Sequence, residues 1–169
     1  MLKECGAIQF GHFVLTSGAT SNYYIDIKKA STNPKILRVF AKLVAKHAEG
    51  YDVVAGIELG AVPLAVAVSL EVNKPFVIVR KEKKEHGTGK LLEGPDISHK
   101  KVLLVEDVTT TGGSVVKAIK CLRENNAMVD KVVTVVDRLS GAKEKLREMR
   151  VELISLLDVN DILKKDNDF

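Results

Sequence analysis

The sequence predicts an α/β domain built on a central parallel sheet with helices on its faces. Short apolar runs alternate with segments in which apolar residues recur at helical spacing, an order typical of strands joined by helical crossovers. The expected strands are apolar at almost every position, as strands are when both faces of a sheet are covered. No repeat or linker interrupts the 169 residues, so we expect one domain, 1–169.

Each helix is expected where apolar residues recur every three to four positions. The first core helix, 34–48, has Asn33 to cap its N-terminus and Pro34 at its first position. The other expected helices are 61–72, 113–125 and 142–149, followed by a short terminal one. The expected strands are 52–56, 75–79, 102–106, 131–137 and 151–157.

The first 30 residues have a different pattern and predict a small N-terminal hood over this sheet. Segments 10–18 and 21–27 are expected to form a short antiparallel pair around a turn rich in Ser, Gly and Thr. We therefore divide the domain into a hood, about 1–30, and a core, about 31–169.

Charge is concentrated in one part of the chain. The net charge is +4, and residues 80–90 contain five basic and two acidic residues, a surplus of three. A local surplus indicates one anionic ligand at one place and argues against a broad basic surface for nucleic acid.

Several classes of protein are excluded by what the sequence lacks. No stretch approaches the ~18 consecutive apolar residues of a membrane span, and the start has no secretory pattern. Cys5 and Cys121 have neither a CxxC partner nor a neighbouring His, so we expect no disulfide and no dedicated metal site. The expected protein is cytoplasmic, with no membrane or nucleic-acid partner.

Polar residues follow the buried strand 102–106. Glu106 and Asp107 are followed by three threonines, two glycines and Ser114, at which point a helix is expected. In parallel α/β sheets ligands bind beyond the carboxyl ends of the strands. Hydroxyls, glycines and the free N–H groups of a helix form a cradle for phosphate, and the carboxylates can accept hydrogen bonds from a vicinal diol. The segment thus suits a ribose 5-phosphate. The alternative, Asp107 in a turn and Ser114 as a helix cap, explains fewer of the positions.

Four motifs carry a resemblance to a known family. VLLVEDVTTTGGS resembles the signature of type I phosphoribosyltransferases, which bind phosphoribosyl pyrophosphate. FGHFVLTSGATSNYYIDIKKA, VRKEKKEHGTG and VVDRLSGA, in this order, are similar to orotate phosphoribosyltransferases. The resemblance runs from about Phe10 to about Ala142. It implies the type I phosphoribosyltransferase fold and transfer of the phosphoribosyl group to orotate, which yields orotidine 5′-monophosphate and pyrophosphate in pyrimidine (UMP) synthesis.

The resemblance also implies roles for individual residues. Lys84, His86 and Asp107 would be catalytic, the first two by supplying positive charge or a proton to the leaving group. Orotate would contact Thr110, Arg138, Tyr23 and Tyr24, and the planar fork of an arginine suits the carboxylate of orotate. Phosphoribosyl pyrophosphate would be bound by Arg80, Lys81, Lys84, His86, Glu106, Asp107, Val108, Thr109, Thr110, Thr111, Gly112, Gly113 and Ser114.

The same family works with Mg²⁺ and as a homodimer. Mg²⁺ is expected to be held by substrate oxygens and water, so we assign no protein ligand. In the dimer, loop 80–90 would complete the neighbour's site, with Lys81, Lys84 and His86 acting in trans. Thr16 and Gly60 stand where relatives often have Lys, so the diphosphate contact is expected to depend more on backbone N–H groups and on loop 80–90.

Two alternative functions remain open at this point. One is transfer to a purine base, against which the VVDR and SGATSNYY segments speak. The other is a regulator that binds phosphoribosyl pyrophosphate as an effector and grips DNA or RNA. Such a regulator would usually carry a nucleic-acid module, and none is visible.

Overall fold

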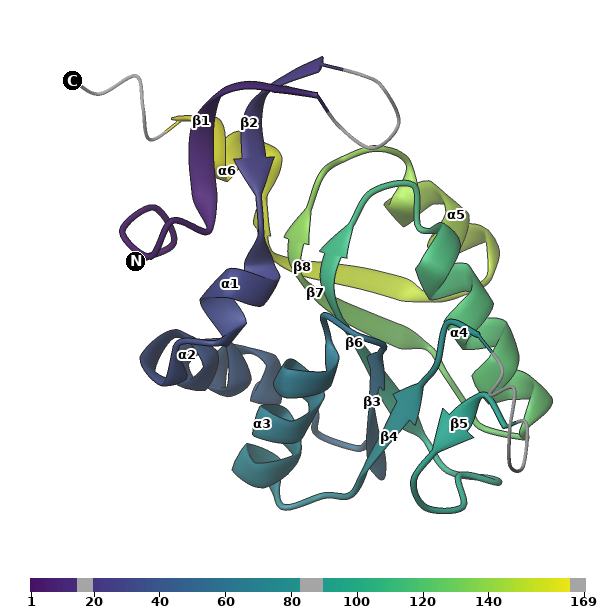
Figure 1. The fold of residues 1–169 in the computed structure, drawn as a ribbon. Coiled ribbons are helices and arrows are strands. Elements are labelled where there is room, and N and C mark those ends of the chain that lie inside the picture. Colours follow the sequence, from purple (N-terminus) through teal and green to yellow (C-terminus); the bar gives the residue numbers. More distant parts are fainter. Residues whose placement is uncertain (15–19, 83–89, 165–169) are drawn as a thin grey trace.

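A six-stranded sheet forms the centre of the computed structural model, which describes residues 1–14, 20–82 and 90–164. The strand order is β5-β4-β3-β6-β7-β8, and all neighbours are parallel except β5, which runs antiparallel to β4 (Figure 1). The predicted parallel sheet is therefore confirmed. Its strands are β3 (Val53–Ile57), β4 (Phe76–Val79), β5 (Leu92–Glu93), β6 (Val102–Thr109), β7 (Lys131–Asp137) and β8 (Glu152–Asp158).

Helices cover both faces of this sheet. Along β6, Leu103 and Val105 pack on one face with two of the helices, whereas Val102 and Leu104 pack on the opposite face with two others. This alternation along the strand explains why β6 is apolar at successive positions. The first face is covered by α2 (Pro34–Ala45) and α3 (Val62–Val72), and the second by α4 (Gly113–Glu124) and α5 (Ala142–Glu148).

The hood is a separate antiparallel pair of strands, as predicted. β1 (Ile8–Val14) pairs with β2 (Thr20–Ile25), with Phe10 opposite Tyr23. The short helix α1 (Ile27–Ser31) links the hood to α2, and α6 (Val159–Lys164) follows the last strand. No helix within the described ranges has the length and apolar character needed to cross a membrane.

The boundaries near the ligand edge differ from those predicted. The strand expected at 102–106 continues to Thr109, because Val108 and Thr109 still pair with Val136 and Asp137 of β7. Asp107 therefore belongs to the strand and not to the following loop. The two-residue β5 and the five-residue α1 were not predicted, since such short elements are too short to show a hydrophobic periodicity.

A glycine lets α3 approach the sheet closely enough to bring its preceding loop over the strand ends. A Cβ built on Gly56 would lie 2.6 Å from the Ala65 Cβ and 2.9 Å from the Ala61 carbonyl oxygen. Any side chain here would push α3 away from β3. The loop 58–61 consequently lies next to the end of β6.

Candidate functional site

A pocket of about 300 Å³ lies beyond the carboxyl end of β6. Gly112 adopts a left-handed conformation (φ 75°) just before α4, and no side chain caps that helix. The first N–H groups of α4 are thus available to an anion, which is the arrangement that favours phosphate. Ser114 does not cap the helix, contrary to the alternative reading of this segment. The pocket is lined by Glu106, Val108, Thr109, Thr110, Thr111, Gly112, Gly113, Ser114, Val115 and Lys117.

The loop between β6 and α4, residues 110–112, is called the phosphate loop below, and a residue of α5 also contacts it. Lys145 Nζ donates a hydrogen bond to the Thr111 carbonyl oxygen at 3.0 Å. This bond places a further cation beside the pocket. The sequence patterns had not singled out Lys145.

A buried carboxylate ties the ends of β6 and β7 together. The Thr109 hydroxyl donates to Asp137 Oδ1 at 2.9 Å, and the backbone N–H of Leu139 donates to the same oxygen at 3.2 Å. Arg138 N donates to the Thr109 carbonyl oxygen at 2.9 Å. Asp137 is only 3% exposed. The loop that carries the pocket and the loop that carries Arg138 therefore share one set of hydrogen bonds.

Two acidic residues stand at the end of β6 in different environments. Glu106 is buried, and burial, together with a smaller effect of neighbouring Asp107, raises its pKa to about 9 against an opposing effect of Lys81. Glu106 therefore keeps its proton near neutral pH. The Asp107 side chain is 14% exposed and lies 3.9 Å from Lys28 Nζ. Asp107 is thus the more accessible acceptor for a ligand hydroxyl.

The residues predicted to contact orotate lie at the next strand end and in the hood. The Arg138 guanidinium lies 5.4 Å from the centre of the Tyr23 ring, so a hood residue and a core residue face each other. Tyr24 instead packs against Phe13, at 5.7 Å between ring centres. This separation follows from the strand, because successive side chains point to opposite faces. Thr110 is exposed in the phosphate loop.

The basic loop begins at the end of β4. Arg80 N donates to the Leu91 carbonyl oxygen, and Arg80 Nε lies 3.7 Å from Glu58 in the loop after β3. Lys81 is exposed and lowers the pKa of Glu106 within the same chain. Lys84 and His86 lie outside the described residues, as does Thr16.

Gly60 lies against the side chain of Asp107, which leaves no room for a larger residue. A Cβ built on Gly60 would overlap the Asp107 carboxylate, so any larger residue would have to move this loop or Asp107. The close contact accounts for a glycine where relatives often have Lys.

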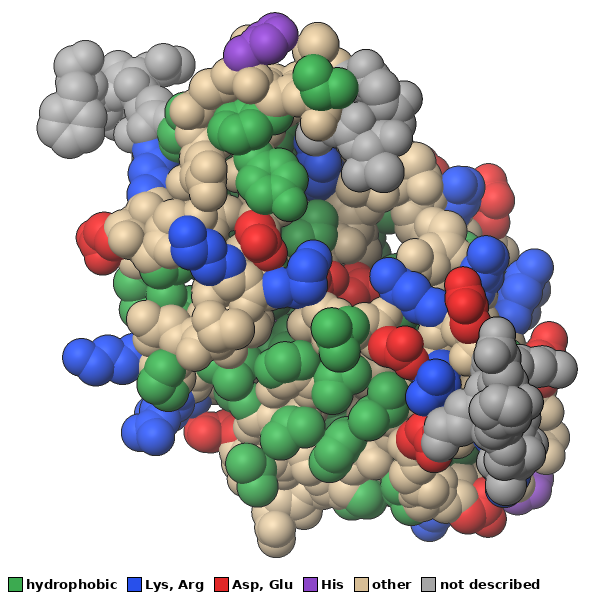
Figure 2. Space-filling view, in the orientation of Figure 1, with side chains coloured by type: hydrophobic (Ala, Val, Ile, Leu, Met, Phe, Trp, Pro, Cys, Tyr) green, Lys and Arg blue, Asp and Glu red, His purple; other side chains and the backbone are tan. Residues whose placement is uncertain are grey.

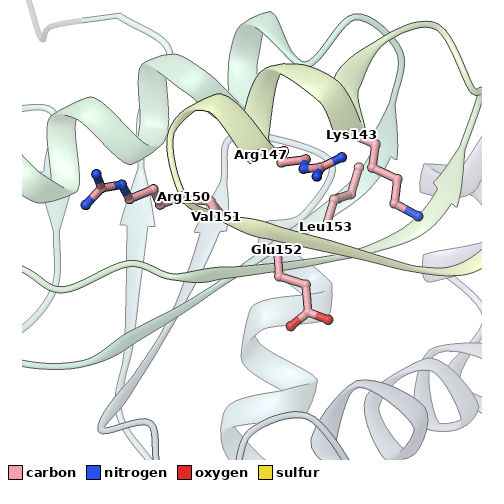
Figure 3. Close-up of a pocket in the computed structure, with 6 residues that line it drawn as sticks. All are labelled: Lys143, Arg147, Arg150, Val151, Glu152 and Leu153. Carbon is pink, nitrogen blue, oxygen red and sulfur yellow. The ribbon is translucent and has the colours of Figure 1, made fainter.

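A second concave region lies between α5 and β8, away from the strand ends. It measures about 390 Å³ and is lined partly by Lys143, Arg147 and Arg150. Figure 3 shows that Arg150 extends away from Lys143 and Arg147, so the three charges do not converge on one point. Among residues 1–14, 20–82 and 90–164 no group of three or more His, Cys, Asp or Glu forms a metal site.

Comparison with known proteins decides the family. Residues 27–161 match the model of the phosphoribosyl transferase domain. The chain belongs to this family. A Methanocaldococcus jannaschii relative, named orotate phosphoribosyltransferase, is 56% identical and is matched over 96% of this chain and 93% of its own length. The resemblance seen in the motifs is therefore confirmed.

Solved structures of the family agree with the fold. The crystal structure of orotate phosphoribosyltransferase from Aeropyrum pernix has a TM-score of 0.86 and 35% identity, covering 98% of this chain and 96% of that one. An orotate phosphoribosyltransferase from Mycobacterium tuberculosis, solved with 5-phospho-α-D-ribosyl 1-diphosphate, has a TM-score of 0.75 and 30% identity. It covers 89% of this chain and 88% of that chain. The type I phosphoribosyltransferase fold is thus confirmed.

Glu106 leads to a prediction about pH and stability. The folded chain keeps the Glu106 proton up to about pH 9, whereas the unfolded chain loses it near pH 4.5. Between these values the unfolded state binds fewer protons, so this group makes stability fall as pH rises. In Glu106→Gln this component disappears. One pKa unit is worth roughly 1 kcal/mol. We therefore expect the free energy of unfolding of the variant, relative to that of the wild type, to rise by on the order of a few kcal/mol from pH 5 to pH 8.

Urea denaturation at a series of pH values measures this difference. Glu124→Gln, at an exposed position in α4, is the matched control and should follow the wild type. If the free energies of unfolding of the wild type and Glu106→Gln changed in parallel with pH, the raised pKa of Glu106 would be contradicted.

Asp137 leads to a prediction about both substrate loops. Asp137→Ala leaves the Thr109 hydroxyl and the Leu139 N–H without their acceptor in a buried place, at a cost of about 1–3 kcal/mol for each group. Because the acceptor serves both loops, ligands of the phosphate loop and ligands of Arg138 should both bind more weakly. Calorimetric titration with ribose 5-phosphate and with orotate measures the two effects.

Asp137→Asn is the control, since an amide oxygen can still accept both hydrogen bonds. It should retain most of the affinity for each ligand. Loss of affinity for only one ligand in Asp137→Ala would show that Asp137 does not connect the loops.

Proposed function

We propose that this chain transfers the phosphoribosyl group of phosphoribosyl pyrophosphate to orotate, with release of pyrophosphate. One observation carries this proposal: the phosphate loop after β6 is linked by hydrogen bonds to the segment after β7, where Arg138 faces Tyr23 of the hood. The 56% identity to an orotate phosphoribosyltransferase supports the choice of acceptor. Its product, orotidine 5′-monophosphate, belongs to pyrimidine synthesis. A cytoplasmic location stays a prediction.

The phosphoribosyl group is bound by two parts of the β6–α4 segment. The uncapped N-terminus of α4 and the Thr110 and Thr111 hydroxyls receive the 5′-phosphate. Asp107, at the strand end, accepts hydrogen bonds from the ribose hydroxyls, and protonated Glu106 beside it keeps the local negative charge low. The ribose is thereby oriented with its carbon 1 away from the phosphate loop.

Orotate is bound at the end of β7. Arg138 can hold the orotate carboxylate through two parallel hydrogen bonds, and the Tyr23 ring, 5.4 Å from the guanidinium, lies beside the place of the base. Its N1 then faces carbon 1. Holding two reactants in this way can lower the activation barrier by about 7–11 kcal/mol in favourable cases.

The reaction is a displacement at carbon 1. N1 of orotate gives up its proton to solvent, and the N1 electron pair forms the new C–N bond to carbon 1. The C–O bond between carbon 1 and the diphosphate breaks, and the electron pair of this bond leaves with pyrophosphate. Positive charge near the diphosphate stabilises this departure. Arg80 and Lys81 lie at the start of the basic loop, and we retain Lys84 and His86, outside the described residues, as the catalytic cations.

Mg²⁺ is proposed as the cofactor and would neutralise charge on the diphosphate when bound. The end of β6 offers just two adjacent acidic residues, and Glu106 is protonated near neutral pH. This donor set suits an ion that keeps substrate oxygens and water as its main ligands, as Mg²⁺ does.

The surface of α3 supports a homodimer. Nearly all residues of this helix are apolar, with Glu71 its one charged residue, yet Leu70 is 79% exposed and Pro63 is exposed too. Leu59, in the preceding loop, is 70% exposed. Figure 2 shows hydrophobic side chains gathered over this region. A helix with apolar residues on most of its surface is normally buried, and a second copy of the chain would bury this one beside the catalytic edge.

Consumption of orotate tests the function directly. Loss of orotate absorbance is expected when phosphoribosyl pyrophosphate and Mg²⁺ are added, with no reaction of adenine, hypoxanthine or uracil. Arg138→Ala should raise the KM for orotate by about tenfold or more, as loss of a charge-assisted pair implies, with a much smaller effect on phosphoribosyl pyrophosphate.

Arg147→Ala, in the region between α5 and β8, is the matched control and should act like the wild type. Turnover of a purine base instead of orotate would favour a purine phosphoribosyltransferase. Binding of phosphoribosyl pyrophosphate without any turnover would favour the regulator.

The dimer can be tested on α3. Leu70→Glu places a charge in the proposed interface and should convert the dimer to a monomer in analytical ultracentrifugation, with loss of activity if loop 80–90 acts in trans. Met128→Glu changes another exposed apolar residue and should remain dimeric. Mixed Lys84→Ala and Asp107→Ala chains should regain activity through hybrid dimers. A fully active Leu70→Glu monomer would contradict the shared site.

A further inference from the structure

An ion pair joins the hood side of the molecule to the catalytic strand. Lys28 Nζ, from α1, lies 3.9 Å from Asp107 Oδ2, at the end of β6. Neither the motifs nor the reaction assigned a role to Lys28. We propose that Lys28 is a substrate-binding residue whose ammonium group contacts the diphosphate of phosphoribosyl pyrophosphate, and that Asp107 holds it in place before the substrate arrives. The inference rests on the proposed function.

The backbone beneath Lys28 is firmly anchored. Its neighbours Ile27 and Ala30 are 1% and 0% exposed, and Asp26 caps α1 by accepting a hydrogen bond from Lys29 N. Asp26 N in turn donates to the Ala7 carbonyl oxygen at 2.7 Å. Lys28 therefore extends over the strand ends from a fixed point.

The two partners differ in exposure. The Lys28 side chain is 62% exposed, whereas that of Asp107 is 14% exposed. A ligand that enters from solvent consequently meets the ammonium group beside the carboxylate. An ion pair this long, with its lysine in solvent, contributes little to stability, so exchanging Asp107 for a substrate oxygen costs little.

The chemistry of the substrate fits this spacing. Asp107 is the proposed acceptor for the ribose hydroxyls, and the diphosphate is attached to carbon 1, next to the carbon that carries the 2-hydroxyl. A cation a few ångströms from the diol acceptor is therefore close to the leaving group. When the hydroxyls take over the Asp107 oxygens, Lys28 is released to donate to the diphosphate.

Two arginines at this edge already have neighbours. Arg80 lies 3.7 Å from Glu58, and Arg138 lies over Tyr23. Gly60 offers no side chain, since the Asp107 carboxylate takes the space of its Cβ. Lys28 thus supplies, from the hood side, positive charge that the loop after β3 does not supply.

Calorimetric titration of Lys28→Ala separates this role from a structural one. Its affinity for phosphoribosyl pyrophosphate with Mg²⁺ should fall about tenfold or more. Its affinity for ribose 5-phosphate, which lacks the diphosphate, should stay within about twofold of the wild type, as expected when no charge-assisted contact is lost. Lys28→Arg should retain most of the binding to both ligands. Lys29→Ala is the matched control, because Lys29 Nζ lies near Gly6 in the hood.

Each outcome bears on the proposal. Equal weakening of both ligands would mean that Lys28 only supports Asp107 and would overturn the proposal, as would unchanged affinity for both. Melting temperatures of the Lys28 variants should match that of the wild type, since Lys28 is exposed and its ion pair with Asp107 is long. A wild-type chain that binds no phosphoribosyl pyrophosphate would instead refute the proposed function, so the two failures are distinguishable.

Discussion

The hydrogen bonds accepted by the buried Asp137 carboxylate are the constraint on which the site depends. They join Thr109, in the last pairing of β6, to Leu139, just after β7, and so hold two loops with different ligands at one spacing. A phosphoribosyltransferase must place the acceptor atom of a base in line with carbon 1 of a sugar. In this chain the pairing of β6 with β7 sets the relative position of the two binding loops. The hydrogen bonds of Asp137 keep the loops in this position beyond the last paired residues.

The charges around this frame are arranged for a ligand and not for the free protein. Burial raises the pKa of Glu106 to about 9, and Asp107 is paired over 3.9 Å with an exposed lysine. The burial of Glu106 makes the free site less stable than it could be, as is common where binding and catalysis take place. The pair between Asp107 and the lysine is long enough to be exchanged easily for contacts to a ligand. We infer that phosphoribosyl pyrophosphate satisfies these groups, with its hydroxyls on Asp107 and its diphosphate beside Lys28.

The alternating pattern predicted the sheet, its covering helices and the phosphate loop, because segments with a clear hydrophobic periodicity form the predicted strands and helices. Sequence reasoning ended β6 too early, since the polar Asp107 and Thr109 read as loop although pairing with β7 continues. The VVDR motif drew attention to Arg138 but not to Asp137, whose importance lies in what it contacts. Lys28 lies within the FGHFVLTSGATSNYYIDIKKA motif, which assigned it no role, and Lys145 lies outside the four motifs. Their proximity to Asp107 and Thr111 arises only when segments distant in the sequence meet in the fold. The roles of Lys84 and His86 rest on the family resemblance.

A crystal structure of the chain with orotidine 5′-monophosphate tests the central claim, since this molecule carries both the phosphate and the base. We expect the 5′-phosphate at the N-terminus of α4, the ribose hydroxyls on Asp107, and the carboxylate of the base on Arg138, with the Asp137 hydrogen bonds to Thr109 and Leu139 intact. A nucleotide bound with its base away from Arg138, or its phosphate outside the loop before α4, would contradict the account.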